Sequence, residues 1–189
     1  MVKFKEVLIE KIGSFTAWHG SGERFSEFSR SKAHTGEGGA AFGSGIYVSK
    51  NQKVGEFYQK SSKNPNATLY QIKVNIDTDK ILRWDTPFSR QPQPVQDALK
   101  TINYDGSKGT EARYYYHTLR ASFSSNAKSG PVESEKATKY LEDLGLHGIY
   151  FVGDRKYQGP ERDTSKNFVI FDPSKISIIQ RFDQKGNPV

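Results

Sequence analysis

The sequence predicts a single α+β domain that spans residues 1–189. Short apolar strands and helical segments follow each other without a regular strand–helix–strand repeat, which argues against a doubly wound parallel sheet. At 189 residues the chain is long enough to enclose one core. Hydrophobic residues make up only 34%, but 12 Phe and 10 Tyr provide the apolar area that such a core needs. We therefore expect a mixed β-sheet with flanking helices.

The N-terminal third is expected to contain two short strands separated by a long loop. Residues 15–19 and 45–49 are apolar stretches that end or begin at glycines. Ahead of them, residues 4–12 mix charged and apolar side chains and fit either a strand or a short helix. The intervening glycine-rich stretch predicts a loop, with one turn of helix at residues 24–28. Residues 51–59 are expected to form a helix that Asn51 caps.

The middle of the chain contains the clearest strand. Residues 68–76 alternate between apolar and polar side chains, so one face of this strand carries Tyr70, Ile72, Val74 and Ile76. Prolines 87, 92 and 94 then mark a connecting stretch. Helices are expected after it, at residues 95–102 and 111–123.

The C-terminal third predicts one helix followed by three strands. The helix covers residues 134–144 and ends at Gly145. Its inward-facing side chains are expected to be Ala137, Tyr140, Leu141 and Leu144. Strands at residues 147–152, 167–171 and 176–182 are expected to complete the sheet.

Composition excludes several classes of chemistry. The absence of cysteine rules out disulfides, thiolate metal sites and cysteine nucleophiles. No apolar run approaches the length of roughly 20 residues that crosses a membrane, and the N-terminus lacks the pattern of a signal peptide, so we expect a cytoplasmic site of action. The net charge of +7 arises within residues 1–130. This excess fits either an anionic partner such as nucleic acid or a merely soluble surface.

Two short motifs near the start predict the functional site. The first is A-W-H-G-S-G at residues 17–22, and the second is G-S-G-I-Y-V-S at residues 43–49, with Tyr58 eleven positions after Tyr47. Each joins an apolar stretch to glycines that allow a ligand to approach the backbone. His19 would hydrogen-bond a ribose hydroxyl, the backbone of Gly20 would hold a carboxamide, and the two phenol rings would stack on a pyridine ring. We therefore predict a nicotinamide pocket, although each of these residues taken alone fits an ordinary place in the core.

Further segments occur in the same order along the chain. They are T-G-E-G at residues 35–38, the strand at 69–76 followed by L-R-W-D-T-P at 82–87, L-G-L-H-G-I-Y at 144–150, and N-F-V-I-F-D-P at 167–173 with Ile176. With the two motifs they resemble the diphtheria-toxin and poly-ADP-ribose-polymerase class of ADP-ribosyltransferases, and most closely the ADP-ribosyltransferase domain of phage and mobile-element polyvalent proteins. The resemblance covers roughly residues 15–180. It implies an ADP-ribosyltransferase-like fold, in which a split mixed sheet is flanked by helices.

The resemblance implies roles for the matching residues. His19 would bind the ribose on the nicotinamide side, Gly20 the carboxamide, and Ser21 the ribose or phosphate side, while Tyr47 and Tyr58 would enclose the ring. The third signature position, where the polymerases place a glutamate, is Asn167. An amide orients a hydroxyl but cannot act as a base, so polymer elongation is not expected. Glu161 or Glu37 would then supply the carboxylate.

The implied activity is that of a mono-ADP-ribosyltransferase. It would use NAD as a substrate without a metal, release nicotinamide and transfer ADP-ribose to a macromolecular acceptor, either protein or nucleic acid. The resemblance also implies an effector or toxin domain of a bacterium, phage or other mobile element, with an immunity or antitoxin protein as a candidate partner and no membrane association. Two alternatives remain open: an NAD glycohydrolase, in which water is the acceptor, and a non-catalytic binding module.

For the remaining residues that could take part in catalysis or binding, a functional interpretation is weighed against a structural one. His34, His117 and His147 show no metal-ligand spacing and are expected to be structural or surface residues. The run of three tyrosines at 114–116, with its flanking arginines, fits either stacking on bases or helix packing. The basic residues at 155, 156 and 162 fit either contact with an acceptor or a solvated loop.

Overall fold

The computed structural model describes residues 13–30, 41–102, 111–124, 130–154, 156–157, 159–160 and 162–189. Along these residues the strands are β1 (Gly13–Ser21), β2 (Ile46–Ser49), β3 (Thr68–Ile76), β4 (Ile81–Arg83), β5 (Gly148–Val152), β6 (Lys166–Ile170) and β7 (Ile176–Phe182). The α-helices are α1 (Gln52–Ser61), α2 (Gln93–Lys100), α3 (Ala112–Ser122) and α4 (Pro131–Asp143). Short 3-10 turns precede β4, α2 and β7.

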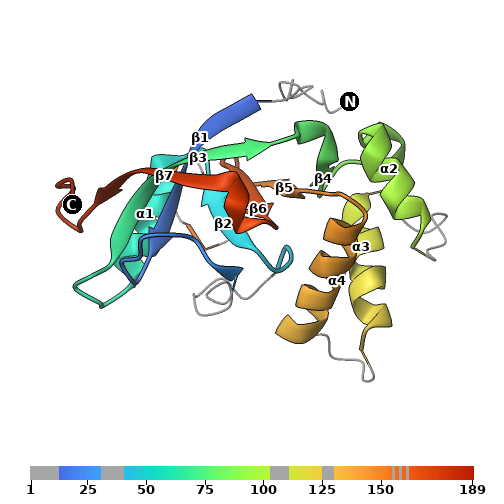
Figure 1. Ribbon diagram of the computed structural model, residues 1–189, viewed down its shortest axis with the longest axis horizontal. Coiled ribbons are helices and arrows are strands. Elements are labelled where there is room, and N and C mark those ends of the chain that lie inside the picture. Colours follow the sequence, from blue (N-terminus) through green and yellow to red (C-terminus); the bar gives the residue numbers. More distant parts are fainter. Residues whose placement is uncertain are drawn as a thin grey trace.

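All seven strands form one mixed sheet in the order β4-β5-β6-β2-β1-β3-β7. Only β4 and β5 run parallel, and the other neighbours are antiparallel. The helices gather in two places on this sheet: α1 lies at the β1–β3 half, and α2, α3 and α4 lie at the β4–β5 end (Figure 1). The α+β class predicted from the sequence is therefore confirmed.

The sheet has an apolar core on each face. The face beneath α2, α3 and α4 includes Leu82, Ile149, Phe151 and Val169. The opposite face is built around the alternating side chains of β3, with Ala17, Val48, Tyr150, Phe168 and Ile170 from neighbouring strands. The predicted inward face of β3 is confirmed, since Tyr70, Ile72 and Val74 are fully buried and Ile76 nearly so.

One strand interface is much weaker than the others. β1 pairs with β3 along its whole length, from Gly13 to Ser21. With β2, however, it shares the single registered pair Trp18↔Ser49. The two strands that carry the predicted motifs are therefore neighbours that part after one residue pair.

The local signals at the ends of the helices mostly act as predicted. The Asn51 side chain caps α1 by accepting a hydrogen bond from the backbone N–H of Lys53 at 2.9 Å. Gly145 ends α4 with a φ of +83°, and the N–H of Leu146 bonds the carbonyl of Leu141, as in a Schellman motif. Leu144 was predicted to face inward, but it lies beyond the last turn and is exposed.

The face of the sheet opposite α2, α3 and α4 is called the second face below. Residues 22–30, which follow β1, lie across it and are called the strap. A helical turn at residues 24–28 was predicted, and this is wrong. Side chains of the sheet bind the backbone of the strap instead: the N–H of Phe25 donates to the Tyr70 hydroxyl at 2.7 Å, and Arg181 donates to the carbonyls of Phe25 and Ser26. The predicted element at residues 4–12 lies outside the described residues.

Candidate functional site

The site predicted from the sequence centres on the junction between β1 and β2. Continuing the register of Trp18↔Ser49 would place Gly20 opposite Tyr47, but the strands separate there. The ring of His19 bridges the separation, with Nδ1 at 2.7 Å from the carbonyl oxygen of Tyr47. The two motifs thus meet where the sheet is least continuous.

This contact defines the state of the imidazole. A carbonyl only accepts hydrogen bonds, so Nδ1 of His19 carries the proton and Nε2 is left as an acceptor. Among the described residues, His19 forms a hydrogen bond through Nδ1 and none through Nε2. Burial lowers the pKa of His19 below its ordinary value of 6.5, although the bond to Tyr47 opposes this shift. The ring is therefore neutral at pH 7.

Aromatic side chains surround His19 on the second face of the sheet. Its ring lies edge-on to Phe28 at 5.1 Å, with Tyr70 at 6.1 Å and Phe25 at 6.2 Å. Phe25 and Phe28 belong to the strap, so the strap holds the imidazole against the sheet. Sequence reasoning missed this role because nothing in the glycine-rich loop indicates where it folds back.

Tyr47 points to the opposite face from His19. Its hydroxyl donates to the carbonyl of Gly43 at 2.9 Å and accepts from the N–H of Phe42 at 3.1 Å, and its ring lies edge-on to Phe151. Burial raises the pKa of Tyr47 well above that of a free phenol. The imidazole and the phenol therefore meet through the backbone of Tyr47, on two sides of one junction, and not around a single open space.

Tyr58 reaches the same side as Tyr47 from helix α1. Its hydroxyl lies 3.0 and 3.1 Å from the two carboxylate oxygens of Asp154, which follows β5. Burial, then Asp154, then Tyr47 raise the pKa of Tyr58. The two phenols are close enough to interact electrostatically, yet their rings make no contact with each other. Sequence reasoning missed Asp154, whose only signal is a G-D pair at the end of a predicted strand.

Asn167 opens the buried part of β6 and pairs with Ser49 of β2. Its Nδ2 donates to the carbonyl of Gly153 at 2.9 Å and to the carbonyl and hydroxyl of Ser165. Its Oδ1 is buried and has no partner. A buried acceptor without a partner costs free energy unless something else binds it, so this oxygen is available to a ligand or a water.

The remaining predicted residues have local roles. A Cβ on Gly20 would collide with the carbonyl oxygen of Gly55 in α1, so close packing of strand and helix is reason enough for this glycine. The Ser21 hydroxyl accepts from the N–H of Glu23 in a tight turn. Glu161 and Glu37 lie outside the described residues.

The other candidates separate into core and surface. His147 accepts a hydrogen bond from the N–H of Asp77, and His117 packs against Trp84. Of the tyrosine run, Tyr115 and Tyr116 are buried in the helix-covered core, which favours packing, and Tyr114 is exposed. Among the residues described, no three His, Asp or Glu gather into a metal site. No helix of the described chain is both long and apolar enough to span a bilayer.

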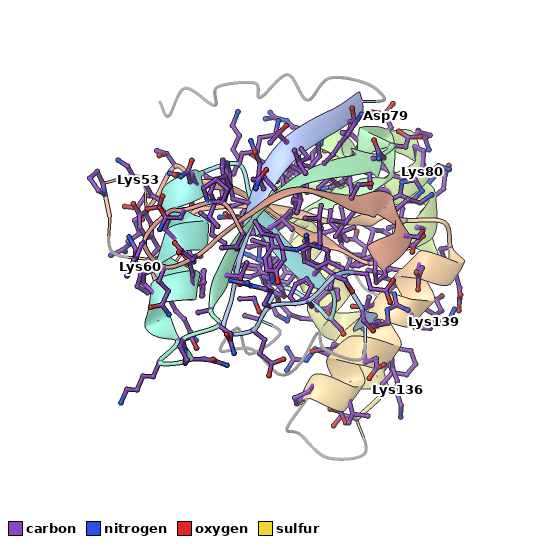
Figure 2. The ribbon with its side chains drawn as sticks, turned by 60° about the vertical axis from the view of Figure 1, so that its left-hand side comes forward. Lys53, Lys60, Asp79, Lys80, Lys136 and Lys139 are labelled. Atoms are coloured by element: carbon purple, nitrogen blue, oxygen red, sulfur yellow. The ribbon has the colours of Figure 1, made fainter. Side chains whose placement is uncertain are left out.

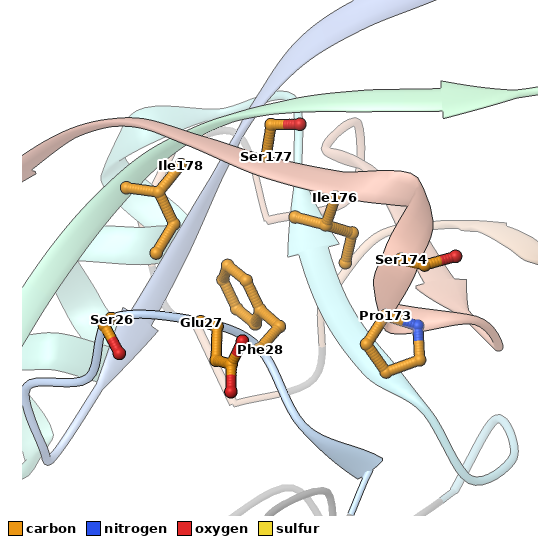
Figure 3. A pocket seen from close by; sticks show the side chains of 8 residues that line it. All are labelled: Ser26, Glu27, Phe28, Pro173, Ser174, Ile176, Ser177 and Ile178. Carbon is orange, nitrogen blue, oxygen red and sulfur yellow. The ribbon is translucent and has the colours of Figure 1, made fainter.

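A hollow of about 430 Å³ lies on the second face, between the strap and the start of β7 (Figure 3). The strap lines one side of it and the start of β7 the other: Ser26, Glu27, Phe28, Pro173, Ser174, Ile176, Ser177 and Ile178. None of the predicted site residues lines it, but Phe28, which does, also packs against the imidazole of His19. The strap therefore has one ring that both lines the hollow and touches the site.

Comparison with known proteins gives only distant similarity. No family model matches the sequence, and no curated protein matches it. The fold is similar to a chain of the Mycobacterium tuberculosis MbcT–MbcA toxin–antitoxin complex, with a TM-score of 0.43 and 12% identity over 92% of this chain and 85% of that one. It is also similar to an anti-CRISPR protein, with a TM-score of 0.45 and 16% identity over 88% and 96%. Similarity at this level carries no argument about function.

Proposed function

We propose that this chain is an NAD-cleaving mono-ADP-ribosyltransferase that acts as an effector or toxin domain. The observation that carries the proposal is the junction of β1 and β2. There the imidazole of His19 contacts the backbone carbonyl of Tyr47 through Nδ1, which leaves Nε2 as an acceptor to which no described residue donates. The motif resemblance supports the same activity, since it assigns the ribose to this histidine.

The residues at the junction offer groups for both sides of a nicotinamide–ribose bond: the two phenols for the pyridine ring and the imidazole for the ribose. A pyridine ring between Tyr47 and Tyr58 would need about 3.5 Å on each face, and the two phenol rings pack against other rings and not against each other. Neutral His19 can accept a hydrogen bond from a ribose hydroxyl across the junction. The chemistry needs little more than this, because nicotinamide leaves as a neutral molecule and catalysis consists mainly of orientation and electrostatic stabilisation.

The carboxylate expected for such a site has a candidate in Asp154. It lies against Tyr58, and Gly153 beside it accepts from Asn167. A negative charge at this place would stabilise the oxocarbenium-like ribose. Since Asp154 also fixes the phenol, it would serve as a positioning residue as well as a source of charge.

Hydrolysis of NAD is the second candidate, and Asn167 favours it. Its buried, unpartnered Oδ1 can hold a water as readily as an acceptor hydroxyl. An amide removes no proton, so the water would attack a ribosyl cation that has already formed. The two candidates share the same site and differ only in the final acceptor.

The test is incubation of the chain with NAD labelled in its adenylate part, with and without cell lysate. Transferase activity predicts nicotinamide release with label retained on lysate macromolecules, and protease or nuclease treatment then identifies their class. Hydrolysis predicts equal release without lysate and no retained label. If the wild-type chain releases no nicotinamide under either condition, both enzymatic proposals are refuted and a binding module is left.

A matched pair of variants ties the activity to the junction. His19→Ala removes the imidazole at the junction, whereas His147→Ala removes another imidazole whose Nδ1 bonds the backbone far from it. We expect His19→Ala to abolish release and His147→Ala to retain it. Circular dichroism of both variants checks that each is folded.

A further inference from the structure

We propose that the second face of the sheet, where β4 and β5 end and β6 begins beside the start of β1, binds a single strand of nucleic acid. This surface, termed the basic face below, carries Lys50, Arg83, Lys166 and the half-exposed ring of Phe15, over the buried rings of Tyr150 and Phe168. As a binding surface it is independent of the function proposed above. As the place where an ADP-ribose acceptor docks, it rests on that function.

The basic face is continuous across four strands. Arg83 of β4 pairs with Tyr150 of β5, and Tyr150 pairs with Phe168 of β6. The rings of Tyr150 and Phe168 lie 5.2 Å apart, and those of Phe168 and Phe15 lie 4.7 Å apart. Lys50 closes the row, with its Nζ 4.8 Å above the ring of Phe15.

Lys166 lies beside Lys50 at the same edge. The backbone N–H of Lys50 donates to the carbonyl of Lys166 at 2.9 Å, and Lys166 is two residues from Phe168 on the same face of the strand. Both lysines are exposed. Three cations therefore surround a row of three aromatic rings, of which Phe15 is half-exposed and Tyr150 and Phe168 belong to the core beneath.

The cations of this face have no carboxylate partners within the described part of the chain. In contrast, Lys60, Lys100 and Lys139 on the helices pair with Glu56, Asp97 and Asp143. Unpaired cations along one face produce a positive potential that attracts a polyanion. The charge of this face is thus available to a partner from outside the chain.

Two hydrogen-bond donors on the basic face lack an acceptor. Nε of Arg83 and the hydroxyl of Tyr150 are both buried and unpartnered, although Arg83 as a whole is half-exposed. Leaving such donors without an acceptor costs free energy. Arg83 and Tyr150 are register partners in β4 and β5, so the two groups are neighbours. A phosphate would bind the half-exposed guanidinium of Arg83 first, and it would reach the Tyr150 hydroxyl once the Arg83 side chain moves aside.

The form of the face favours a single strand over a duplex. Half-exposed Phe15, with Val152 beside Lys166, leaves apolar area between the cations, and Val152 is 45% exposed. Single strands are bound by such mixtures of cations and aromatic rings, because unpaired bases can stack. The face begins one residue from Ser49 and Asn167, so a bound strand would lie next to the junction.

The test is the fluorescence anisotropy of labelled 12-nucleotide single strands, both DNA and RNA, and of a 12-base-pair duplex, without NAD. Lys50→Gln, Arg83→Gln and Lys166→Gln together remove three charges from the basic face. Lys60→Gln, Lys100→Gln and Lys139→Gln together remove three charges from other surfaces of the molecule. Figure 2 shows two of these residues far apart, Lys60 on α1 and Lys139 on α4. The two triple variants have the same net charge.

We expect the first variant to weaken single-strand binding by more than about tenfold, and its salt dependence to decrease by about 2 in the slope of log affinity against log salt. The matched variant should bind almost as the wild type. Equal weakening in both variants would mean that only net charge matters and would overturn the proposal. Tighter binding of the duplex, or no binding by the wild type, would overturn it as well.

Tyr150→Phe provides a second measurement that does not depend on the charged residues. Because the Tyr150 hydroxyl has no hydrogen-bond partner among the described residues, its removal should leave the melting temperature unchanged or higher. We expect single-strand affinity to fall at the same time by about three- to tenfold. Unchanged affinity would contradict the assigned phosphate contact. Nicotinamide release, measured in parallel, reports separately on the proposed function, since a chain that binds a strand but releases nothing refutes only the enzyme.

Discussion

The hydrogen bond between Tyr58 and Asp154 allows the candidate site to be tested quantitatively. Hydrogen bonds to charged groups contribute about 1.5–3 kcal/mol when protected from solvent. Both side chains are half-buried, so solvent screening reduces the expected value to about 1–2 kcal/mol. Asp154 also accepts from the backbone N–H groups of Lys156 and Tyr157. A double-mutant cycle with Tyr58→Phe and Asp154→Ala removes these other bonds from the result, because they are lost equally on both sides of the cycle.

The assay is urea unfolding of the wild type, both single variants and the double variant, followed by NAD turnover of each. We expect a coupling free energy of about 1–2 kcal/mol, equivalent to a shift in melting temperature of about 2–8 °C in a chain of this size. Tyr58→Phe should raise KM more than it lowers kcat, because its ring remains but is no longer held. Asp154→Asn should lower kcat, because it keeps an acceptor for Tyr58 and loses the charge. A coupling below about 0.3 kcal/mol would refute the reasoning, since independent sites add to within that value.

Three further predictions follow from other contacts. Turnover of NAD should be constant above pH 7 and fall on the acid side with a midpoint below 6.5. The reason is that burial lowers the pKa of His19, and a proton on Nε2 removes the acceptor. A midpoint above 6.5 in a pH–rate profile would contradict this. Gly20→Ala should destabilise the fold by about 1–3 kcal/mol in urea unfolding, because its Cβ meets the backbone of Gly55, and a neutral effect would mean that α1 moves freely. Gln59→Leu should cost about 1–3 kcal/mol by the same measurement, since its buried amide donates to the carbonyls of Ala67 and Phe182 at 3.2 and 3.1 Å.

Strong local patterns were sufficient to predict much of the fold. The strands at residues 68–76 and 176–182 match β3 and β7 at both ends, because alternation of side chains is a property of the sequence itself. The helix predicted at residues 134–144 begins three residues earlier, at Pro131, a favourable residue for the first turn. β4 was missed because three residues are too few to show a periodic pattern. Its parallel pairing with β5 also depends on residues far away in the sequence.

The candidate site was less predictable than the fold. The spacing of Tyr47 and Tyr58 predicted two phenols that enclose one nicotinamide ring, and this stays a prediction. No spacing could indicate that β1 and β2 separate after one pair, because register is decided by the whole sheet. The contact of Tyr58 with Asp154 spans 96 residues, so it too depends on tertiary structure.

Packing accounts for several motif residues, and the functional argument therefore depends on the others. Gly20 is explained by its approach to helix α1, and the hydroxyl of Tyr47 is satisfied within its own loop. Packing leaves two acceptors unexplained on the strands that flank β2: Oδ1 of Asn167, which is buried without a partner, and Nε2 of His19, to which no described residue donates. A chain selected only for stability would bond a buried acceptor such as Oδ1 of Asn167 or replace it with an apolar group of similar size. Their presence on both sides of the weakest strand interface is the reason to look for a hydroxyl-bearing ligand there.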